Sequence, residues 1–529
     1  MEAGYKLCLR KPWVNIGKCR VYSNLMPPVS KAEAEELDKF LEAGDWKGAA
    51  YWLEEKFGSY AFIYEHGDKV VAGVDAVAVE PLFYHLQGQK LLIGDDLRKF
   101  PGSGDKAPLF ARAEVVMVGF VTGEETLVKG VKQILSGKCH VFSKREGGWD
   151  MEKVAHTTFL TSRYDLPDMD AEEFLAGCTK VWEKVVSRTL ERVGDRQIAL
   201  PLSGGLDSRT LALMFRQAGK ENVVCYTYGK QGNQESMVSK SIAKVLGYKW
   251  EFAHYTPGMW TEWDKSPATK EWLDCCFLGR SCIPHINDLP ALDQFFQRRV
   301  FEEDAVFIPG HILGTLAGIF TPDLKNYRDS EACFNATFND ISEKYFDPGL
   351  LYGFYPDLDT EGFYGNLKNK LRAWWPDWSL ATVNGYAEVF YNWGERQSKF
   401  NASSVQFYLH RGHHFALPWC DGSIVRFLEK VPHQHRLHRR MYRKWLEKRG
   451  EGILPVSPVR NSPIHKVQRA YRKWIPKPLR KIRYKIWPYL YYRIHPMEFF
   501  STVPYKDFKR LHKHGFHINN WIAYKYLEG

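Results

Sequence analysis

A six-residue string, Ser203-Gly-Gly-Leu-Asp-Ser208, combines residue types that can hold a phosphate group. Its glycines let main-chain N–H groups approach an anion closely, and the two serine hydroxyls add further donors. The carboxylate of Asp207 can hold Mg²⁺ against phosphate oxygens. No lysine stands where the G-x4-G-K-[ST] loop carries one. We therefore expect a nucleotide site in which Asp207 is the metal ligand and the phosphates contact Leu202, Ser203, Gly204, Gly205, Asp207 and Ser208.

The flanking pattern predicts that this string joins a strand to a helix. Residues 198–202 form a short apolar run, and a helix is expected over about 208–218. A second strand over 223–228 and a second helix over 234–246 follow. Alternation at this spacing indicates a parallel sheet covered by helices. The helix after the string would aim the positive end of its dipole at the anion.

The chain before residue 160 has the short apolar runs of a β-rich domain. A helix is expected over about 31–55, and residues 161–168 are typical of a linker. Asp170 followed by Glu173 is a capping-box pattern that predicts a helix start. Residues 335–448 are expected to be mainly helical. Four early strands are predicted, over 60–64, 70–74, 91–93 and 115–118.

Composition limits the class of protein. The chain has 529 residues, of which 44% are hydrophobic and 26% charged, as in multidomain globular proteins. No apolar h-region opens the chain and no stretch reaches about 18 apolar residues, so the cytoplasm is the expected compartment. The ten cysteines match no zinc spacing and are expected to be buried thiols.

Strings further along the chain resemble the asparagine synthetase family, whose members adenylate a carboxylate with ATP and pass it to an amine. The resemblance covers about residues 50–460 and implies ATP and Mg²⁺ as cofactors. It implies that Tyr228 and Gly229 lie beside adenine and that Glu395 lies near the reacting centre as a base. Arg396 and Arg460 are the other catalytic residues it implies. The strings that carry it are 226–229, 240–247, 282–288, 395–399 and 417–421.

The first domain resembles class II glutamine amidotransferases, through the strings 58–62, 74–75, 81–84 and 119–137. Two residues depart from that pattern. Glu2 stands where glutamine-hydrolysing relatives expose a cysteine, and Val74 replaces the arginine that grips the carboxylate of glutamine. Because nucleophile and base both come from that N-terminal cysteine, the domain is expected to be structural and without glutaminase activity.

Two departures affect the synthetase part. Gly314 stands where relatives carry a second acid for Mg²⁺, and His311 nearby is a poor ligand for that ion. Ser462 stands where a lysine is expected to stabilise charge during adenylation, with Lys466 close by.

The net charge of +11 is concentrated late in the chain, since no acid occurs between Gly452 and Met497. Within it, residues 466–493 interleave basic and aromatic side chains. The favoured interpretation is a solvated basic face on the synthetase core. An anionic membrane surface is a second one, and nucleic acid is the least favoured partner.

These observations predict an α/β and α+β multidomain protein: an Ntn-hydrolase-like β sandwich, then a PP-loop α/β domain with a helical second half. The predicted domains are 1–160, 165–465 and 466–529. The favoured function is an ATP-dependent amidoligase that joins a small-molecule, glycan or peptide carboxylate to ammonia or an amine. The alternative is a non-catalytic descendant that binds a nucleotide or a partner. Nucleic-acid modification is a third, disfavoured class.

Overall fold

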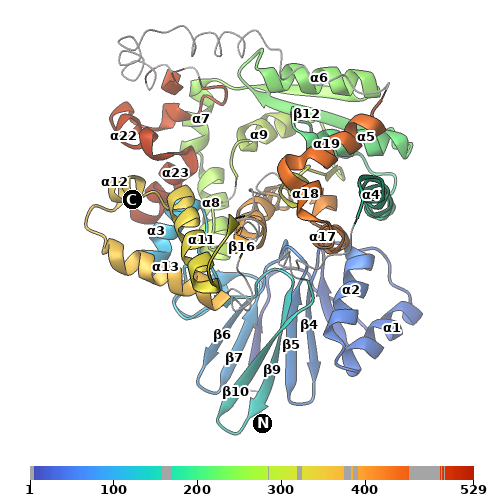
Figure 1. Cartoon of the computed structure of the whole chain (residues 1–529), viewed down its shortest axis with the longest axis vertical. Helices are drawn as coiled ribbons and strands as arrows, with labels where there is room; N and C mark the ends of the chain where they lie inside the picture. The colour runs from blue at the N-terminus through green and yellow to red at the C-terminus, as the bar shows by residue number, and fades with distance from the viewer. Residues whose placement is uncertain are drawn as a thin grey trace.

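A computed structural model describes residues 5–157, 169–283, 285–318, 325–374, 383–384, 391–451, 489, 491–493 and 495–529 (Figure 1). Glu2, Arg460, Ser462, Lys466 and the predicted linker lie outside the described residues. So does the basic tail, apart from positions 489 and 491–493. Predictions that rest on these positions stay predictions.

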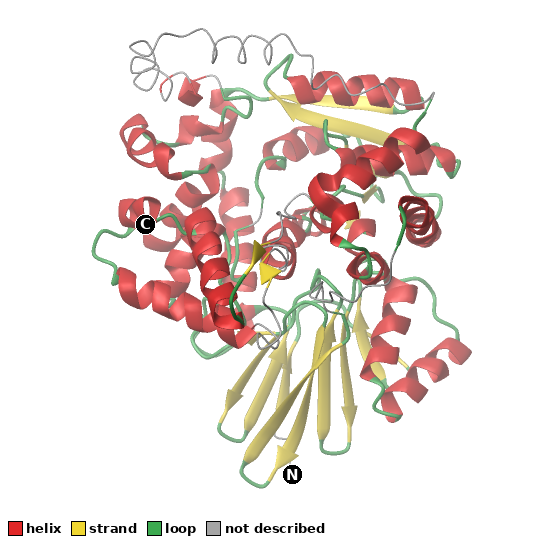
Figure 2. Cartoon of the chain, in the orientation of Figure 1, coloured by secondary structure: helices red, strands yellow, loops and turns green. Residues whose placement is uncertain are grey.

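The N-terminal part of the chain is a sandwich of two sheets (Figure 2). One sheet has the strand order β1-β7-β6-β8 and the other β10-β9-β5-β4-β3-β2. The strands are β1 (Tyr5–Cys8), β2 (Val14–Ile16), β3 (Cys19–Tyr22), β4 (Ala61–His66), β5 (Lys69–Val74), β6 (Phe83–Gln87), β7 (Lys90–Gly94), β8 (Lys132–Gln133), β9 (Lys138–Arg145) and β10 (Gly148–Ala155). The expected strands at 60–64, 70–74 and 91–93 are thereby confirmed.

Alternation along β4 explains why both faces of the larger sheet are buried. Ala61 and Ile63 point into the core between the two sheets. Phe62 and Tyr64 point to the opposite face, where they pack with residues of α1 (Lys31–Glu42) and α2 (Trp46–Phe57). Side chains of a strand alternate between faces with a period of two, so one short run serves two cores.

Two predictions for this part are wrong in detail. The run 115–118 is the end of helix α3 (Leu109–Val118), not a strand. Its residues from Ala111 to Met117 are all buried, and a helix buried all round has no amphipathic pattern that distinguishes it from a buried strand. The single helix expected over 31–55 is two helices, because Gly44 turns the chain at φ 71° and Asp45 caps α2.

The second large sheet is parallel throughout, with the order β13-β12-β11-β14-β17. Its strands are β11 (Ile198–Pro201), β12 (Val223–Gly229), β13 (Lys249–His254), β14 (Val306–Phe307) and β17 (His414–Phe415). The predicted strand–helix alternation is confirmed: α4 (Ala171–Val193) begins at the Asp170–Glu173 capping box, and α5 (Leu206–Gln217) and α6 (Gln234–Leu246) follow their strands. The phosphate-type string therefore leaves the carboxyl end of the central strand.

The rest of the described chain is mainly helical, as expected. Its helices are α7 (Pro257–Lys265), α8 (Pro267–Arg280), α9 (Leu289–Gln297), α10 (Leu313–Leu316), α11 (Ser330–Tyr345), α12 (Pro348–Phe354), α13 (Thr360–Trp374), the π-helix η3 (Asn392–Asn401), α15 (Ala402–Ser404), α16 (Gln406–His410), α17 (Gly422–Glu429), α18 (His433–Arg436), α19 (Arg440–Arg449), α22 (Tyr505–Leu511) and α23 (Ile518–Glu528). The two-stranded pair of β15 (Lys325–Asn326) and β16 (Val383–Asn384) lies among them. In the described ranges no helix has the length and apolar character needed to cross a bilayer.

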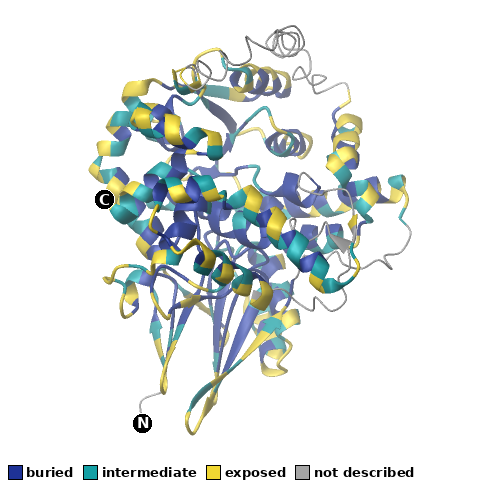
Figure 3. Ribbon diagram, turned by 60° about the vertical axis from the view of Figure 1, so that its left-hand side comes forward, coloured by how far each residue is buried: buried dark blue, intermediate teal, exposed yellow. Residues whose placement is uncertain are grey.

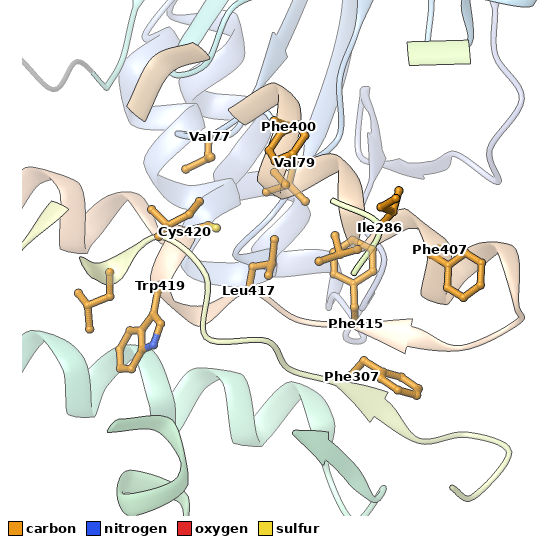
Figure 4. Close-up of a cluster of buried hydrophobic side chains, with 14 of the residues drawn as sticks. Val77, Val79, Ile286, Phe307, Phe400, Phe407, Phe415, Leu417, Trp419 and Cys420 are labelled. Carbon is orange, nitrogen blue, oxygen red and sulfur yellow. The ribbon is translucent and has the colours of Figure 1, made fainter. Parts of the chain in front are cut away.

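The loops at the end of the sandwich and helix α3 share one hydrophobic cluster with the parallel sheet, while the strands of the sandwich pack in clusters of their own. Buried residues are drawn dark blue in Figure 3. In Figure 4, Val77 and Val79 of the sandwich lie toward Phe400 and Leu417 of the second part. Residues 495–529 reinforce this junction, because α23 packs on α3 and Nδ2 of Asn520 donates to the carbonyl of Val116 at 2.7 Å. The two parts are therefore joined through buried side chains.

Candidate nucleotide and acceptor site

The two serines of the string 203–208 brace the loop. The main-chain N–H of Ser203 donates to Oγ of Ser208 at 3.1 Å, and the two hydroxyl oxygens are also 3.1 Å apart. Oγ of Ser203 accepts from the N–H of Gly205 at 3.1 Å. Arg209 adds a contact from its guanidinium to the carbonyl of Gly204 at 3.2 Å. The loop conformation is thus fixed by its own side chains before any ligand enters.

Helix α5 begins in a way that suits an anion. Its N-cap residue is Gly205, and no side chain caps the first turn. The first N–H groups of a helix have no partner within the helix, and they carry the positive end of its dipole. The string therefore presents main-chain donors at the carboxyl edge of the sheet, as the sequence predicted.

Asp207, the predicted metal ligand, lies in the first turn of α5 and is held by donors from two distant segments. Its Oδ2 accepts from the N–H of Gly314 at 2.7 Å, and its Oδ1 accepts from the hydroxyl of Tyr442 at 3.2 Å. Thr210 shares that hydroxyl at 2.9 Å. Burial raises the pKa of Asp207 to about 6, although both hydrogen bonds and nearby Arg439 oppose the shift. Removal from water is thus the dominant influence on this carboxyl.

The segment 309–314 lies directly against the start of α5. A Cβ at Gly310 would be 2.5 Å from the nitrogen of Ser208, so only glycine permits this approach. A Cβ at Gly314 would be 2.9 Å from Oδ2 of Asp207. Between them Ile312 has φ 84°, a costly conformation for a β-branched residue. The close contact is therefore maintained against backbone strain.

A magnesium ion is implied by the family resemblance, and the residues around Asp207 do not fit one. Mg²⁺ needs near-octahedral oxygen coordination, which proteins supply through one or two carboxylates together with water and phosphate. Across the described ranges, no group of three or more His, Cys, Asp or Glu side chains is placed to hold a metal. Both oxygens of Asp207 already accept hydrogen bonds, and Gly314 brings an N–H where a second acid was expected. His311 has a buried ring whose pKa desolvation lowers to about 4.

The predicted adenine edge, Tyr228 and Gly229, ends strand β12 beside the string. The ring of Tyr228 stacks on Tyr255 with centroids 5.4 Å apart. Gly229 has φ 116°, and a Cβ there would be 3.2 Å from the carbonyl oxygen of Pro496. The N–H of Lys230 donates to that same carbonyl at 2.7 Å. The C-terminal segment therefore packs on the edge of the sheet that was predicted to lie beside adenine.

Glu395, the predicted base, is fully buried on the π-helix η3 and faces the sandwich. Its Oε2 pairs with Nζ of Lys399 at 2.8 Å and accepts from the N–H of Gly123 at 3.1 Å. Lys399 also donates to the carbonyls of Val121 at 2.8 Å and Gly123 at 2.5 Å. Burial raises the pKa of Glu395 despite the lysine beside it. Both residues of the ion pair lie on η3, and their hydrogen bonds to Val121 and Gly123 join the two halves of the molecule. A role of Glu395 as base stays a prediction.

Arg396, the next residue, lies on the wall of a cavity of about 230 Å³. The cavity lies between the end of α3, the helices around η3 and the C-terminal segment, with Lys344, His285 and His517 also on its wall. The one acid on this wall, Asp347, pairs with His514 at 3.0 Å. Desolvation, with a smaller effect from the charge of Arg396, lowers the pKa of His517 to about 4. Because desolvation favours the neutral forms of His285 and His517, Arg396 and Lys344 supply positive charge to this wall, which suits a small anion.

In the sandwich, the retained residue of the amidotransferase-like pair is structural. Asp75 is buried and accepts hydrogen bonds from the N–H groups of Tyr60, Val77 and Val79. Val74 is also buried, and its carbonyl lies 2.8 Å from Nε2 of His156. The aspartate thus has a local role that does not depend on the arginine which Val74 replaces.

Comparison with known proteins identifies the central part of the chain. Residues 181–287, which include the whole phosphate-type string and the edge at Tyr228 and Gly229, match the asparagine synthase family. This segment is therefore similar to asparagine synthases. A probable glutamine-hydrolysing asparagine synthetase of Acanthamoeba polyphaga mimivirus is 41% identical over 223 residues. That match covers 42% of this chain and 38% of the viral protein, so the chain spans about two-fifths of the relative it matches.

The asparagine synthase match stops before Glu395, Arg396 and Gly314, so it does not test their roles. Among solved structures, the glutamine phosphoribosylpyrophosphate amidotransferase of B. subtilis, complexed with ADP and GMP, covers 58% of this chain and 64% of its own. At 10% identity and a TM-score of 0.15, this likeness carries no argument.

Sequence reasoning missed several residues of this candidate site. Tyr442 and Arg439 approach Asp207 from more than 230 residues away, within a basic run that carries no motif. Lys399 was included in the string 395–399 but was given no role. His517 lies in a segment that contains no family motif. Only the three-dimensional contacts identify them.

Proposed function

We propose that this chain is an ATP-dependent amidoligase of the asparagine synthetase type. A carboxylate oxygen of the substrate attacks the α-phosphorus of ATP, the bond from that phosphorus to the bridging oxygen breaks, and pyrophosphate leaves. Ammonia or an amine then attacks the acyl carbon; the C–N bond forms, the C–O bond to AMP breaks, and the nitrogen loses a proton. The observation that carries the proposal is the serine-braced loop at the uncapped start of α5, within the segment that matches asparagine synthase.

The chain's own residues account for two tasks in this scheme. Ser203, Gly204, Gly205 and Ser208 hold the phosphates, and Asp207 positions the loop against the segment 309–314. Arg396 on the cavity wall binds the carboxylate substrate through charge-assisted hydrogen bonds. We propose that nitrogen comes as free ammonia or as an amine, because the apolar Val74 cannot pair with the carboxylate of glutamine.

The test is release of pyrophosphate from ATP across a panel of small-molecule, sugar-acid and peptide carboxylates, with ammonium or amines as acceptors. Hydroxylamine in place of the amine should trap the acyl-adenylate as a hydroxamate. Asp207→Ala should lower the rate by about 10²-fold or more, in keeping with the loss of a positioning group. A normal rate in that variant would overturn the role of Asp207. ATP binding without pyrophosphate release across the whole panel would favour the alternative, a non-catalytic nucleotide-binding descendant.

A further inference from the structure

The inference concerns Arg439, which lies beside Asp207 and Gly314. One of its guanidinium nitrogens, Nη1, is 3.4 Å from the position that a Cβ on Gly314 would take. The same Cβ would be 2.9 Å from Oδ2 of Asp207. Arg439 therefore brings a positive charge to the point where the family pattern expects a second acid, and it does so next to the phosphate-type loop.

Arg439 is held in a strained backbone conformation. His438 and Arg439 have φ values of 54° and 58°, so two consecutive non-glycine residues are left-handed just before α19. Non-glycine residues in this region are strained and persist where the surrounding structure fixes them.

The guanidinium of Arg439 is half-buried, and its N–H donors are not engaged by protein acceptors. Among the described residues, Arg439 makes no hydrogen bond and no ion pair within 4.0 Å, although the charge of nearby Asp207 acts on it. A guanidinium offers five N–H donors in a planar fork that matches two phosphate oxygens. An arginine in this position is equipped to bind an anion that the protein itself does not supply.

The metal that the family resemblance implies finds no second carboxylate here. Each oxygen of Asp207 already accepts one hydrogen bond, and a side chain at position 314 would crowd this carboxylate. We infer that Arg439 binds the departing phosphates of the nucleotide directly and that this chain holds ATP and pyrophosphate without needing a protein-bound Mg²⁺. The inference rests on the proposed function, since it assigns the charge that stabilises the phosphates in the same site.

The experiment measures the binding of ATP and of pyrophosphate to the full chain by calorimetry, once in EDTA and once in Mg²⁺. Wild-type protein should bind both ligands in EDTA, with dissociation constants within about threefold of those in Mg²⁺. Arg439→Ala should weaken binding in EDTA about tenfold or more, the expected loss for a charge-assisted contact. The matched control is Arg440→Ala, which removes the exposed neighbouring arginine and should leave both constants unchanged.

A second variant, Arg439→Gly, keeps the test valid if alanine disturbs folding, because glycine adopts φ 58° without strain. It should fold at least as well as the wild type and still lose the affinity. Binding that requires Mg²⁺, or equal affinities in wild type and both Arg439 variants, would overturn this inference while leaving the amidoligase proposal intact. Absence of binding under both conditions would overturn the amidoligase proposal as well.

Discussion

The main-chain N–H of Gly314 donates to Oδ2 of Asp207 at 2.7 Å, across 107 residues of sequence. This contact ties the segment 309–314 to the first turn of α5. It is possible because position 314 has no side chain: a Cβ would be 2.9 Å from one carboxylate oxygen and 3.2 Å from the other.

Gly314→Ala should therefore displace the Asp207 carboxylate and weaken nucleotide binding about tenfold, since the added methyl cannot fit without moving it. The measurement is the dissociation constant for ATP. Gly365→Ala is the matched control, because a Cβ on that helical glycine meets nothing within 4 Å. The control should bind normally and gain slightly in stability. Equal affinity in the two variants would contradict the importance of this contact.

We expect the Glu395–Lys399 ion pair to contribute to the stability of the folded chain. Lys399→Met leaves a fully buried carboxylate without its partner, which should cost about 3–5 kcal/mol of unfolding free energy. The double variant Glu395→Gln/Lys399→Met should lose less than the two single changes combined. Chemical denaturation of all three variants provides the measurement.

The same series separates structure from catalysis at Glu395. If Glu395 acts as a base, Glu395→Gln will lower the rate of amide formation far more than it lowers the temperature of unfolding. If the residue is only structural, activity and stability will fall together. With hydroxylamine as the nucleophile, which needs little help from a base, we expect Glu395→Gln to lower the rate of product formation only as much as it lowers stability.

Arg396→Ala should raise KM for the carboxylate substrate by about tenfold, because the cavity loses the cation proposed to pair with it. The dissociation constant for ATP should not change, since the cavity wall does not include the residues of the phosphate-type loop. Arg328→Ala, a change at an exposed surface arginine, serves as the control. A change in ATP affinity with an unaltered KM would place Arg396 in the nucleotide site instead.

Purified protein should release no glutamate from glutamine, with or without ATP. Val74 cannot pair with the carboxylate of glutamine, and Asp75 is occupied by three main-chain donors. Steady glutamate release after removal of contaminating glutaminases would contradict this expectation.

Asp75 should make stability depend on pH. Burial raises its pKa from 3.8 to about 7, so the folded state binds this proton more tightly than the unfolded state. The free energy of unfolding should therefore fall as pH rises from about 4 to about 7, and stay low above that. Asp75→Asn lacks this titration, so the advantage of wild type should shrink by about 2–3 kcal/mol between about pH 5 and pH 7. A difference that is independent of pH would show that the carboxyl titrates normally.

Local signals in the sequence predicted several elements well. Helix α6 has the expected bounds because Asn233 caps its start and Gly247 ends it in the left-handed region. The Asp170–Glu173 capping box marks the start of α4 for the same reason. Helix α3 was missed because its apolar residues are buried on all sides by elements distant in sequence.

In the candidate site too, the parts encoded by a local string were predicted and the parts formed by distant segments were not. The loop 203–208 and its strand–helix setting follow from a contiguous string, so they were predicted. The donors around Asp207 come from Gly314 and Tyr442, and their approach depends on how remote segments pack. The pairing of Glu395 with Lys399 is local, but its contact with Gly123 is not. The expectation for Arg460 stays a prediction.

The position of α23 has a consequence for how the chain folds during its synthesis. The apolar surface of α3 is completed only when Asn520 reaches the carbonyl of Val116, about 400 residues later in the sequence. At a translation rate of about 5–20 residues per second, α3 waits roughly 20–80 s for its cover. Over that interval the apolar surface of α3 that α23 later covers stays exposed on the nascent chain. A ribosome-associated chaperone that shields apolar helices could bind this surface during that time.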